Sequence, residues 1–321
     1  MLHKNYPRTL SLVLLTILTF PTVVIGVEET AENLLGKVVS SFQLQSYAAS
    51  AVYIRPSGME SINIKHEGGL ERISFNNDEE YVRSVTVLND KEIHQAGGDI
   101  RVHHNKTHFN ALRHFQKNLA KGLKSYDLFI SKHYDQVAGI QTARLSVISK
   151  NNDRYSYIYW IDTLNNIVLR TDTLNETGEL IERMVFTSFA LKKTTEQSIS
   201  QIVNLASVKA SHYHHEANLK AGQVMMQWLP SNFTVFSRQS IYDDEGVLSY
   251  KFILLTDGFA SIGIYLGHYT DEAKLTRGEQ LDAFHVFKRT INANKISIEG
   301  QLPYEILEKI GLNIMVGNSS D

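Results

Sequence analysis

An aromatic run between Arg154 and Asp162 constrains the fold more than any other part of the chain. The run alternates with a period of two, which is the period of a β-strand. The residues that share one face of this strand are Tyr155, Tyr157, Tyr159 and Ile161. Trp160 lies on the other face. Turn signals at Asn165-Asn166 and at Gly178 are each followed by another strand-like segment, so the pattern predicts a three-stranded antiparallel meander. Because both faces carry aromatic residues, the meander must be covered or must bind something apolar.

The rest of the first half predicts one helix and further strands. Thr30 can cap a helix whose apolar residues are spaced by three and four: Leu34, Leu35, Val38, Val39 and Phe42. Strand-like segments follow at 47–54, 59–66, 70–75, 81–88 and 91–95, and again from Tyr126 onward. A polar stretch between them includes a predicted helix at 110–121. This order favours an α+β fold in which a curved antiparallel half-barrel wraps around a helical plug.

The second half predicts a separate, smaller domain. Residues 191–221 have the pattern of a connection with a helix at 196–207. Beyond it, strand-like segments lie at 233–242, 247–255, 259–266, 284–290 and 295–300, with a helix after Pro303. Asp257-Gly258 predicts a tight hairpin turn between the second and third of these segments. We therefore predict a signal peptide at 1–26, an N-terminal domain at 27–190, a linker at 191–221 and a sheet-and-helix domain at 222–321.

Residues 1–26 have the pattern of a cleaved secretory signal peptide. Lys4 and Arg8 precede an apolar stretch, and Val24 and Gly26 are small enough to flank a cleavage site. An uncleaved membrane anchor is the alternative, but the apolar stretch is short and interrupted for a spanning helix. We therefore expect a soluble protein outside the cytoplasm.

Charge and cysteine content exclude several classes of function. The formal net charge is −2, and loss of the predicted signal peptide, with two basic and no acidic residues, makes it −4. No cluster of Lys and Arg stands out, which argues against a nucleic-acid partner. The chain has no cysteine, so it has no disulfides, no cysteine nucleophile and no thiolate metal ligands.

Two groups of histidines are candidate metal ligands. The first comprises His103, His104, His108 and His114, and the second comprises His212, His214 and His215 with Glu216. No acidic residue lies between Arg101 and Ser125 to complete the first site, and the second has the composition of an exposed connection. We favour solvated segments over metal sites and expect no cofactor. Because no motif assembles a nucleophile, a base and an orienting group, we do not expect an enzyme.

Five segments, taken in order, resemble the RseB/MucB family. They are Gly58-Met59-Glu60-Ser61 with His66; the run at 154–162 with Arg170, Gly178-Glu179 and Glu182; Trp228-Leu229-Pro230 with Phe233; Thr256-Asp257-Gly258-Phe259; and Glu299-Gly300-Gln301-Leu302-Pro303. The matches extend from about Ala31 to Ile314. The segment at 101–125 departs most from the family, because polar and basic residues replace a Pro-containing aromatic stretch.

The resemblance implies a periplasmic negative regulator of the sigma-E envelope-stress response. Such a regulator binds the periplasmic domain of a membrane-spanning anti-sigma factor of the RseA/MucA kind and protects it from site-1 proteolysis. It is released on sensing lipid, either lipopolysaccharide or a mislocalised lipoprotein. The family's N-terminal domain is similar in fold to the lipoprotein carriers LolA and LolB, whose half-barrels hold lipid. The resemblance also places the partner contact on the C-terminal domain and the linker.

The row of tyrosines has two interpretations. It either packs the sheet against the N-terminal helix or forms the wall of a cavity for acyl chains. The resemblance favours the second, and we nominate as lipid-binding residues Tyr155, Tyr157, Tyr159 and Trp160. Burial of a lipid chain contributes roughly 0.8 kcal/mol per methylene, so part of one chain suffices for useful affinity.

Two other functions stay open. A periplasmic lipid or lipoprotein carrier of the LolA class would explain the N-terminal part, but not the ordered matches between residues 228 and 303. A metal-dependent periplasmic enzyme would use the histidine groups. The sequence leaves the identity of the lipid and homo-oligomerisation undetermined.

Overall fold

The computed structural model of the chain describes residues 29–67, 70–75, 83–88, 91–96, 99–104, 122–192, 213–214, 224–242, 248–267, 283–291 and 294–317. The predicted signal peptide, the predicted helices at 110–121 and 196–207, and most of the predicted linker lie outside the described residues. Within the described residues, no helix is both long and apolar enough to span a bilayer.

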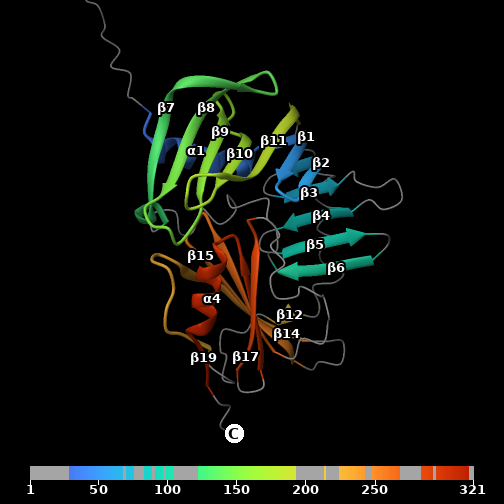
Figure 1. Cartoon of the computed structure of the whole chain (residues 1–321). Helices are drawn as coiled ribbons and strands as arrows, with labels where there is room; N and C mark the ends of the chain where they lie inside the picture. The colour runs from blue at the N-terminus through green and yellow to red at the C-terminus, as the bar shows by residue number, and fades with distance from the viewer. Residues whose placement is uncertain are drawn as a thin grey trace, which may run out of the picture.

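An 11-stranded antiparallel sheet forms the N-terminal domain (Figure 1), in the order β6-β5-β4-β3-β2-β1-β11-β10-β9-β8-β7. The strands are β1 (Ser46–Arg55), β2 (Gly58–Glu67), β3 (Leu70–Phe75), β4 (Arg83–Leu88), β5 (Lys91–Ala96), β6 (Asp99–His104), β7 (Tyr126–Val137), β8 (Ile140–Ser149), β9 (Ser156–Asp162), β10 (Val168–Leu174) and β11 (Leu180–Leu191). Pairing of β1 with β11 joins the two runs of hairpins into one sheet. The predicted meander is confirmed as β9-β10-β11.

Strand β6 was not expected, because its sequence is polar and follows a predicted chain break. It pairs with β5 along its whole length, from Ala96 opposite Asp99 to Lys91 opposite His104. This pairing uses backbone hydrogen bonds, which any side chain except proline permits. Polarity of the side chains therefore did not prevent the sheet from extending to this edge.

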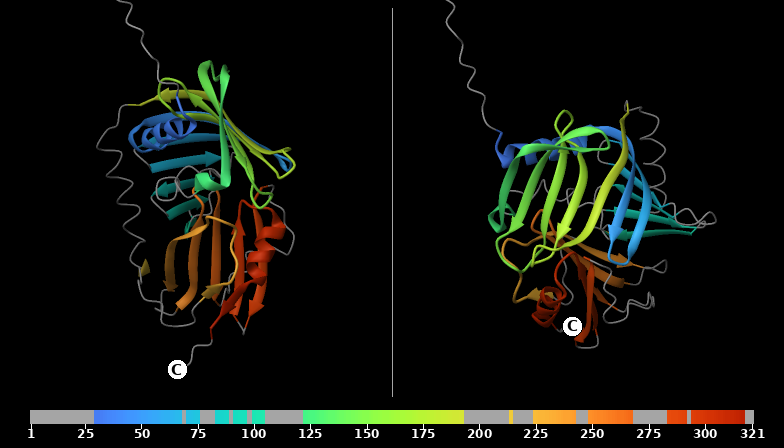
Figure 2. Two further views of the ribbon diagram at one scale, coloured as in Figure 1. Left: turned by 90° about the vertical axis from the view of Figure 1, so that its left-hand side faces the viewer. Right: turned by 45° about the horizontal axis from the view of Figure 1, so that its top comes forward.

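Helix α1 (Ala31–Leu44) lies beneath the arch of the large sheet (Figure 2). Thr30 caps it, because its side-chain oxygen accepts a hydrogen bond from the backbone N–H of Asn33 at 3.2 Å. Leu34, Leu35 and Val38 are buried and share one cluster with the tyrosines of the β9 region. The helical plug predicted from the apolar spacing is confirmed.

The C-terminal domain is a six-stranded sheet in the order β12-β14-β15-β16-β18-β17, packed against a terminal helix. The strands are β12 (Tyr213–His214), β14 (Thr234–Tyr242), β15 (Leu248–Thr256), β16 (Ser261–Gly267), β17 (His285–Ile291) and β18 (Asn294–Gly300). The two-stranded pair β13 (Val224–Met226) and β19 (Ile314–Val316) and a single 3-10 turn, η2 (Leu123–Ser125), complete the described elements. The α+β class with a smaller C-terminal domain is confirmed.

Helix α4 (Tyr304–Leu312) covers one face of this smaller sheet. Leu307 and Ile310 are fully buried in the domain core. A Cβ added to Gly311 would lie 2.4 Å from the ring of Phe287, so only glycine allows the helix to approach β17 this closely. The predicted helix after Pro303 is confirmed, with Pro303 at its N-cap.

We expect Ala138→Asn to stabilise the N-terminal domain. Ala138 and Gly139 form the two-residue turn between β7 and β8, with φ angles of 50° and 76°. A turn with both φ angles positive favours Asn-Gly, whereas alanine is strained there. The free energy of unfolding, measured by urea titration, should rise by about 0.5–1 kcal/mol. Ala138→Val, whose β-branch fits this conformation worse, should lower it; equal stability of all three proteins would contradict this account of the turn.

Candidate functional site

The tyrosines of the β9 region are buried under the arch, as the alternation predicts. Tyr155, Tyr157 and Tyr159 are each exposed by no more than 3% and pack with residues of α1. The rings of Tyr157 and Tyr159 stack with centroids 6.1 Å apart. This side of the sheet therefore presents a continuous aromatic surface to the interior of the arch.

A cavity of about 70 Å³ lies between this aromatic surface and the helix. Val38 and Phe42 line it from α1, and Tyr157 and Tyr159 line it from β9. Other lining residues come from neighbouring strands and include Ile64, Ile73, Thr171, Thr173, Met184 and Phe186. Sites for small-molecule ligands usually measure about 300–1,000 Å³. The cavity as it stands therefore accepts a group of a few atoms and not a whole acyl chain.

Two hydroxyl groups in this cavity have no hydrogen-bond partner among the described residues. The phenol oxygens of Tyr157 and Tyr159 are buried, and neither makes a hydrogen bond to any described residue. Burial raises the pKa of both phenols well above the usual value. The neighbouring Tyr159 and Asp257 raise the pKa of Tyr157 further, and Asp257 raises that of Tyr159. Both therefore remain neutral hydroxyl groups, able to donate a hydrogen bond to a ligand.

Tyr155 lies in the domain interface and does not line the cavity. Its phenol oxygen is 3.4 Å from Nδ1 of His285 in the C-terminal domain. The same ring nitrogen lies 2.8 Å from the backbone oxygen of Leu302. Tyr155, the first tyrosine of the row, therefore contacts the C-terminal domain.

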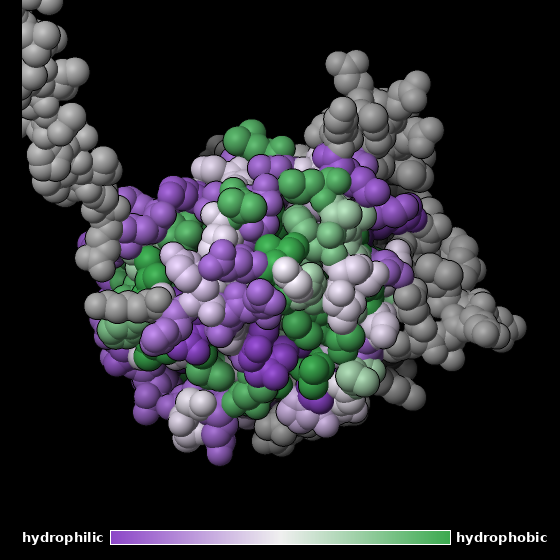
Figure 3. Space-filling model, turned by 90° about the horizontal axis from the view of Figure 1, so that it is seen from above, coloured by the Kyte–Doolittle hydropathy of each residue, from purple (hydrophilic) through white to green (hydrophobic). Residues whose placement is uncertain are grey.

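Trp160 lies on the opposite face of β9, away from the three tyrosines. The guanidinium carbon of Arg170 is 3.8 Å from its ring centroid, and its indole N–H donates to Asp135 at 2.8 Å. Seen from above, the outer face of the arch mixes hydrophilic and hydrophobic residues (Figure 3). Of the four nominated residues, the structure thus brings only Tyr157 and Tyr159 together at the cavity.

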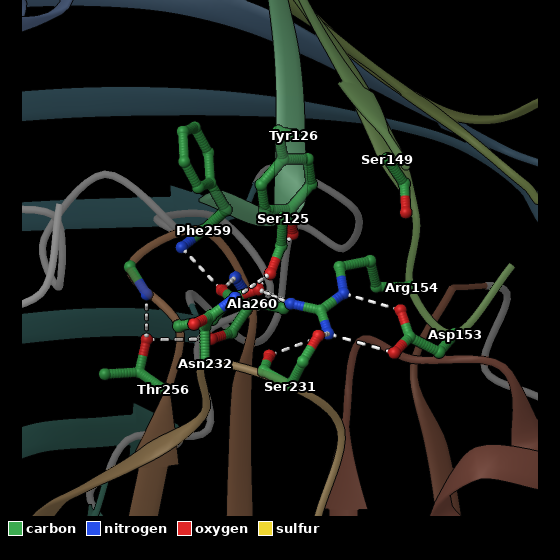
Figure 4. A network of polar contacts seen from close by, with 12 residues as sticks. Ser125, Tyr126, Ser149, Asp153, Arg154, Ser231, Asn232, Thr256, Phe259 and Ala260 are labelled. Atoms are coloured by element: carbon green, nitrogen blue, oxygen red, sulfur yellow. Dashed lines mark hydrogen bonds and ion pairs between the residues drawn. The ribbon is translucent and has the colours of Figure 1, made fainter. Parts of the chain in front are cut away.

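A buried ion pair joins the two domains. Arg154 of the N-terminal domain and Asp257 of the C-terminal domain are both 0% exposed, and Nη1 lies 2.6 Å from Oδ2 (Figure 4). Arg154 also pairs with Asp153 at 2.7 Å and donates to the backbone oxygen of Ser231 at 2.9 Å. The guanidinium group of Arg154 therefore binds groups of both domains, and the two carboxylates compensate its charge.

The other groups around Asp257 complete this network. The hydroxyl of Tyr126 donates to Oδ2 at 3.0 Å, while Oδ1 accepts the backbone N–H groups of Phe259 and Ala260 at 2.9 and 2.8 Å. These bonds fix the Asp257-Gly258 turn, which confirms the predicted hairpin turn. A Cβ on Gly122 would lie 1.8 Å from the backbone oxygen of Asp257. Only glycine therefore permits this close contact between the domains.

The C-terminal domain also closes the cavity. Gln301 is a lining residue of the cavity, and its side-chain amide lies 3.5 Å from Oε2 of Glu182. Oε1 of Glu182 accepts the backbone N–H of Ala283 at 3.0 Å. The ring of Phe259 stacks near Tyr157, with centroids 6.4 Å apart. The cavity is thus bounded by both domains.

The histidine groups do not supply a site in the described part of the chain. Among the described residues, no three His, Asp or Glu side chains are grouped to hold a metal ion. The backbones of His103 and His104 lie in β6 and that of His214 lies in β12. His108, His114, His212, His215 and Glu216 lie outside the described residues.

Sequence reasoning missed the interdomain network. Asp257 was expected only to make a turn, and Gly122 was not singled out. Alternation along the strand places Arg154 on the same face as Trp160, opposite the tyrosines. One signal was present: a charged arginine directly precedes an otherwise aromatic strand, where burial demands a paired charge. The location of its partner 103 residues further along the chain could not be inferred from that signal.

We expect Arg154→Met to lower the free energy of unfolding by about 3–5 kcal/mol, because it leaves Asp257 buried without its cation. The chain has two tryptophans, Trp160 in the N-terminal and Trp228 in the C-terminal domain. Urea unfolding followed by tryptophan fluorescence therefore reports on the C-terminal domain in a Trp160→Phe background and on the N-terminal domain in a Trp228→Phe background. The urea midpoints of the two domains should lie further apart in Arg154→Met than in the parent.

The double variant Arg154→Met with Asp257→Asn is the control for this prediction. It removes both charges but keeps the side-chain oxygen that accepts the two backbone N–H groups. It should recover part of the lost stability. If Arg154→Met left both midpoints unchanged, the ion pair would not hold the domains together.

Both domains of the chain match models of known protein families. The family model described as the MucB/RseB N-terminal domain matches residues 30–203, and that of the MucB/RseB C-terminal domain matches residues 218–315. The sigma-E factor regulatory protein RseB of Haemophilus influenzae is 24% identical over 200 residues, covering 60% of each chain. The protein of the same name from Escherichia coli K12 is 24% identical over 205 residues, covering 61% of this chain and 62% of that one. The chain thus matches about three fifths of the length of these curated relatives.

Solved structures have the same fold over most of the chain. The structure of the Pseudomonas aeruginosa MucA/MucB complex matches with a TM-score of 0.61 and 18% identity, covering 89% of this chain and 98% of that one. A crystal structure of MucB matches with a TM-score of 0.56 and 18% identity, covering 88% and 97%. Since the two family models together span nearly all of residues 30–315, the chain belongs to the MucB/RseB family.

Proposed function

We propose that this protein is a periplasmic negative regulator of the sigma-E envelope-stress response. It binds the periplasmic domain of a membrane-spanning anti-sigma factor and protects that domain from site-1 proteolysis. It is released when a lipid, either lipopolysaccharide or a mislocalised lipoprotein, enters the N-terminal domain. Membership of the family supports this proposal, as do the curated relatives named as sigma-E factor regulatory proteins and a crystal structure of MucB in complex with the periplasmic part of MucA.

One structural observation carries the lipid-sensing part of the proposal: the cavity is bounded by both domains. Gln301 contributes to its lining from the C-terminal domain, and Phe259 packs beside Tyr157. A volume of about 70 Å³ is too small for an acyl chain, so a chain enters only if the domains or α1 move apart. Where the domains move apart, lipid entry competes with docking of the C-terminal domain.

The energies allow such a competition. Separating the domains returns both Arg154 and Asp257 to water, so breaking their pair costs less than the about 3–5 kcal/mol lost when one partner is removed and the other stays buried. Burial of each methylene returns about 0.8 kcal/mol, so roughly six methylenes offset even that upper figure. We propose that the docked state binds the anti-sigma factor and the undocked state binds lipid. The two ligands then weaken each other's binding by the same factor, as linkage requires.

We further propose the domain limits 27–190 and 222–321, joined by a linker at 191–221. The last strand of the large sheet ends at Leu191, and β13 begins at Val224, which supports this division. A carrier of the LolA class would use the cavity without needing the second domain. The network at Arg154 and Asp257, which docks the C-terminal domain, has no role in such a carrier. A regulator needs a docked and an undocked state, and this network stabilises the docked one.

Gly122→Ala should shift the equilibrium between the docked and undocked states toward the undocked state, because the added Cβ would overlap the backbone oxygen of Asp257. Calorimetric titration of residues 27–321 with the periplasmic domain of the anti-sigma factor should show about tenfold weaker binding for this variant. Addition of a lipid A-type lipid should weaken binding by the unaltered chain in the same direction. The variant should retain lipid more tightly than the parent.

Gly36→Ala is the matched control, because a Cβ at Gly36 in α1 meets no atom within 4 Å. It should leave both affinities unchanged. Degradation of the anti-sigma domain by the site-1 protease should be slowed by the parent and by Gly36→Ala, and less by Gly122→Ala. Retention of lipid without any binding of the anti-sigma domain would contradict the regulatory proposal and favour a carrier.

A further inference from the structure

The two hydroxyl groups in the cavity differ from the other tyrosines nearby. Tyr157 and Tyr159 are each 2% exposed, line the cavity and have no hydrogen-bond partner among the described residues. By contrast, the hydroxyl of Tyr126 donates to Asp257, and that of Tyr155 contacts His285. Buried hydroxyl groups nearly always have partners, because leaving one unpaired costs free energy. Among these four tyrosines, the two without a described partner are thus the two that line the cavity.

Both hydroxyl groups are suited to donate to a ligand. Burial raises their pKa, so they stay protonated at any physiological pH. They lie two residues apart on one strand, with their rings stacked, so they point to the same side. Around them the lining is largely apolar, with Val38, Phe42 and Met184 nearby. The cavity therefore combines a pair of donors with walls that suit methylene groups.

We propose that this cavity selects acyl chains that carry an oxygen acceptor, a hydroxyl or an ester carbonyl, and that Tyr157 and Tyr159 donate hydrogen bonds to it. This inference rests on the proposed entry of lipid into the cavity. A plain alkyl chain would fill the space but leave both hydroxyl groups without an acceptor. The resulting penalty discriminates against it, as in other sites built to hydrogen-bond their ligand.

Three lipids with the same glycerol head and the same chain length test this selectivity. They are 1-O-dodecylglycerol, an ether; 1-dodecanoylglycerol, an ester; and 1-(3-hydroxydodecanoyl)glycerol, which adds a chain hydroxyl. Dissociation constants for residues 27–321 would be measured below the concentrations at which these lipids form micelles. We expect at least one oxygen-bearing chain to bind about 3- to 10-fold more tightly than the ether, the effect of one hydrogen bond. The ester and hydroxyester arms distinguish a carbonyl from a hydroxyl as the preferred acceptor.

The double variant Tyr157→Phe with Tyr159→Phe should bind the ether at least as well as the parent, while the preference for the oxygen-bearing chains falls to about onefold. Tyr155→Phe is the matched control: it removes a hydroxyl from the same row but outside the cavity, so the preference should persist even if all affinities change together. Equal binding of the three lipids by the parent would overturn this inference and leave lipid binding itself intact. Failure of all three to bind would overturn the lipid-sensing proposal as well.

Discussion

The buried ion pair between Arg154 and Asp257 determines how the two domains meet. Two charges without solvent are tolerated only with close geometry and further hydrogen bonds, which Asp153, Tyr126 and Ser231 supply. Few other relative positions of the two domains would satisfy these requirements at a similar free energy. The position of the C-terminal domain under the arch, and with it the closure of the cavity, depends on this pair together with the contacts of Tyr155 with His285 and of Glu182 with Ala283.

Docking of the C-terminal domain gives the tyrosines of the aromatic surface different surroundings. Packing and ligand binding were alternative interpretations of the tyrosines, and the structure divides the row between the domain interface and the cavity. Tyr155 contacts His285 across the interface, whereas Tyr157 and Tyr159 line the cavity. The coupling that we propose between a ligand and the arrangement of the domains would therefore act between residues two positions apart in the chain.

Much of the fold follows from local pattern. Alternation between Tyr155 and Asp162 and the turns at Asn166 and Gly178 predict the meander, and both turns have positive φ angles in the structure. Spacing of apolar residues after Thr30 predicts α1 and its cap. These features are local, because a strand's period, a turn's φ angle and a helix cap each depend on residues close together in the chain. Strand β6 escaped prediction because backbone pairing permits a polar sequence.

The candidate site depends instead on contacts between distant residues. The sequence by itself determined that an aromatic strand had to be covered, and it identified Tyr157 and Tyr159 as part of that strand. Only the tertiary structure decided that Trp160 would pack against Arg170, that Arg154 would be buried against Asp257, and that a second domain would bound the cavity. Periodicity fixes which side chains share a face, but burial and pairing depend on which segments pack against that face, and this is a property of the whole folded chain.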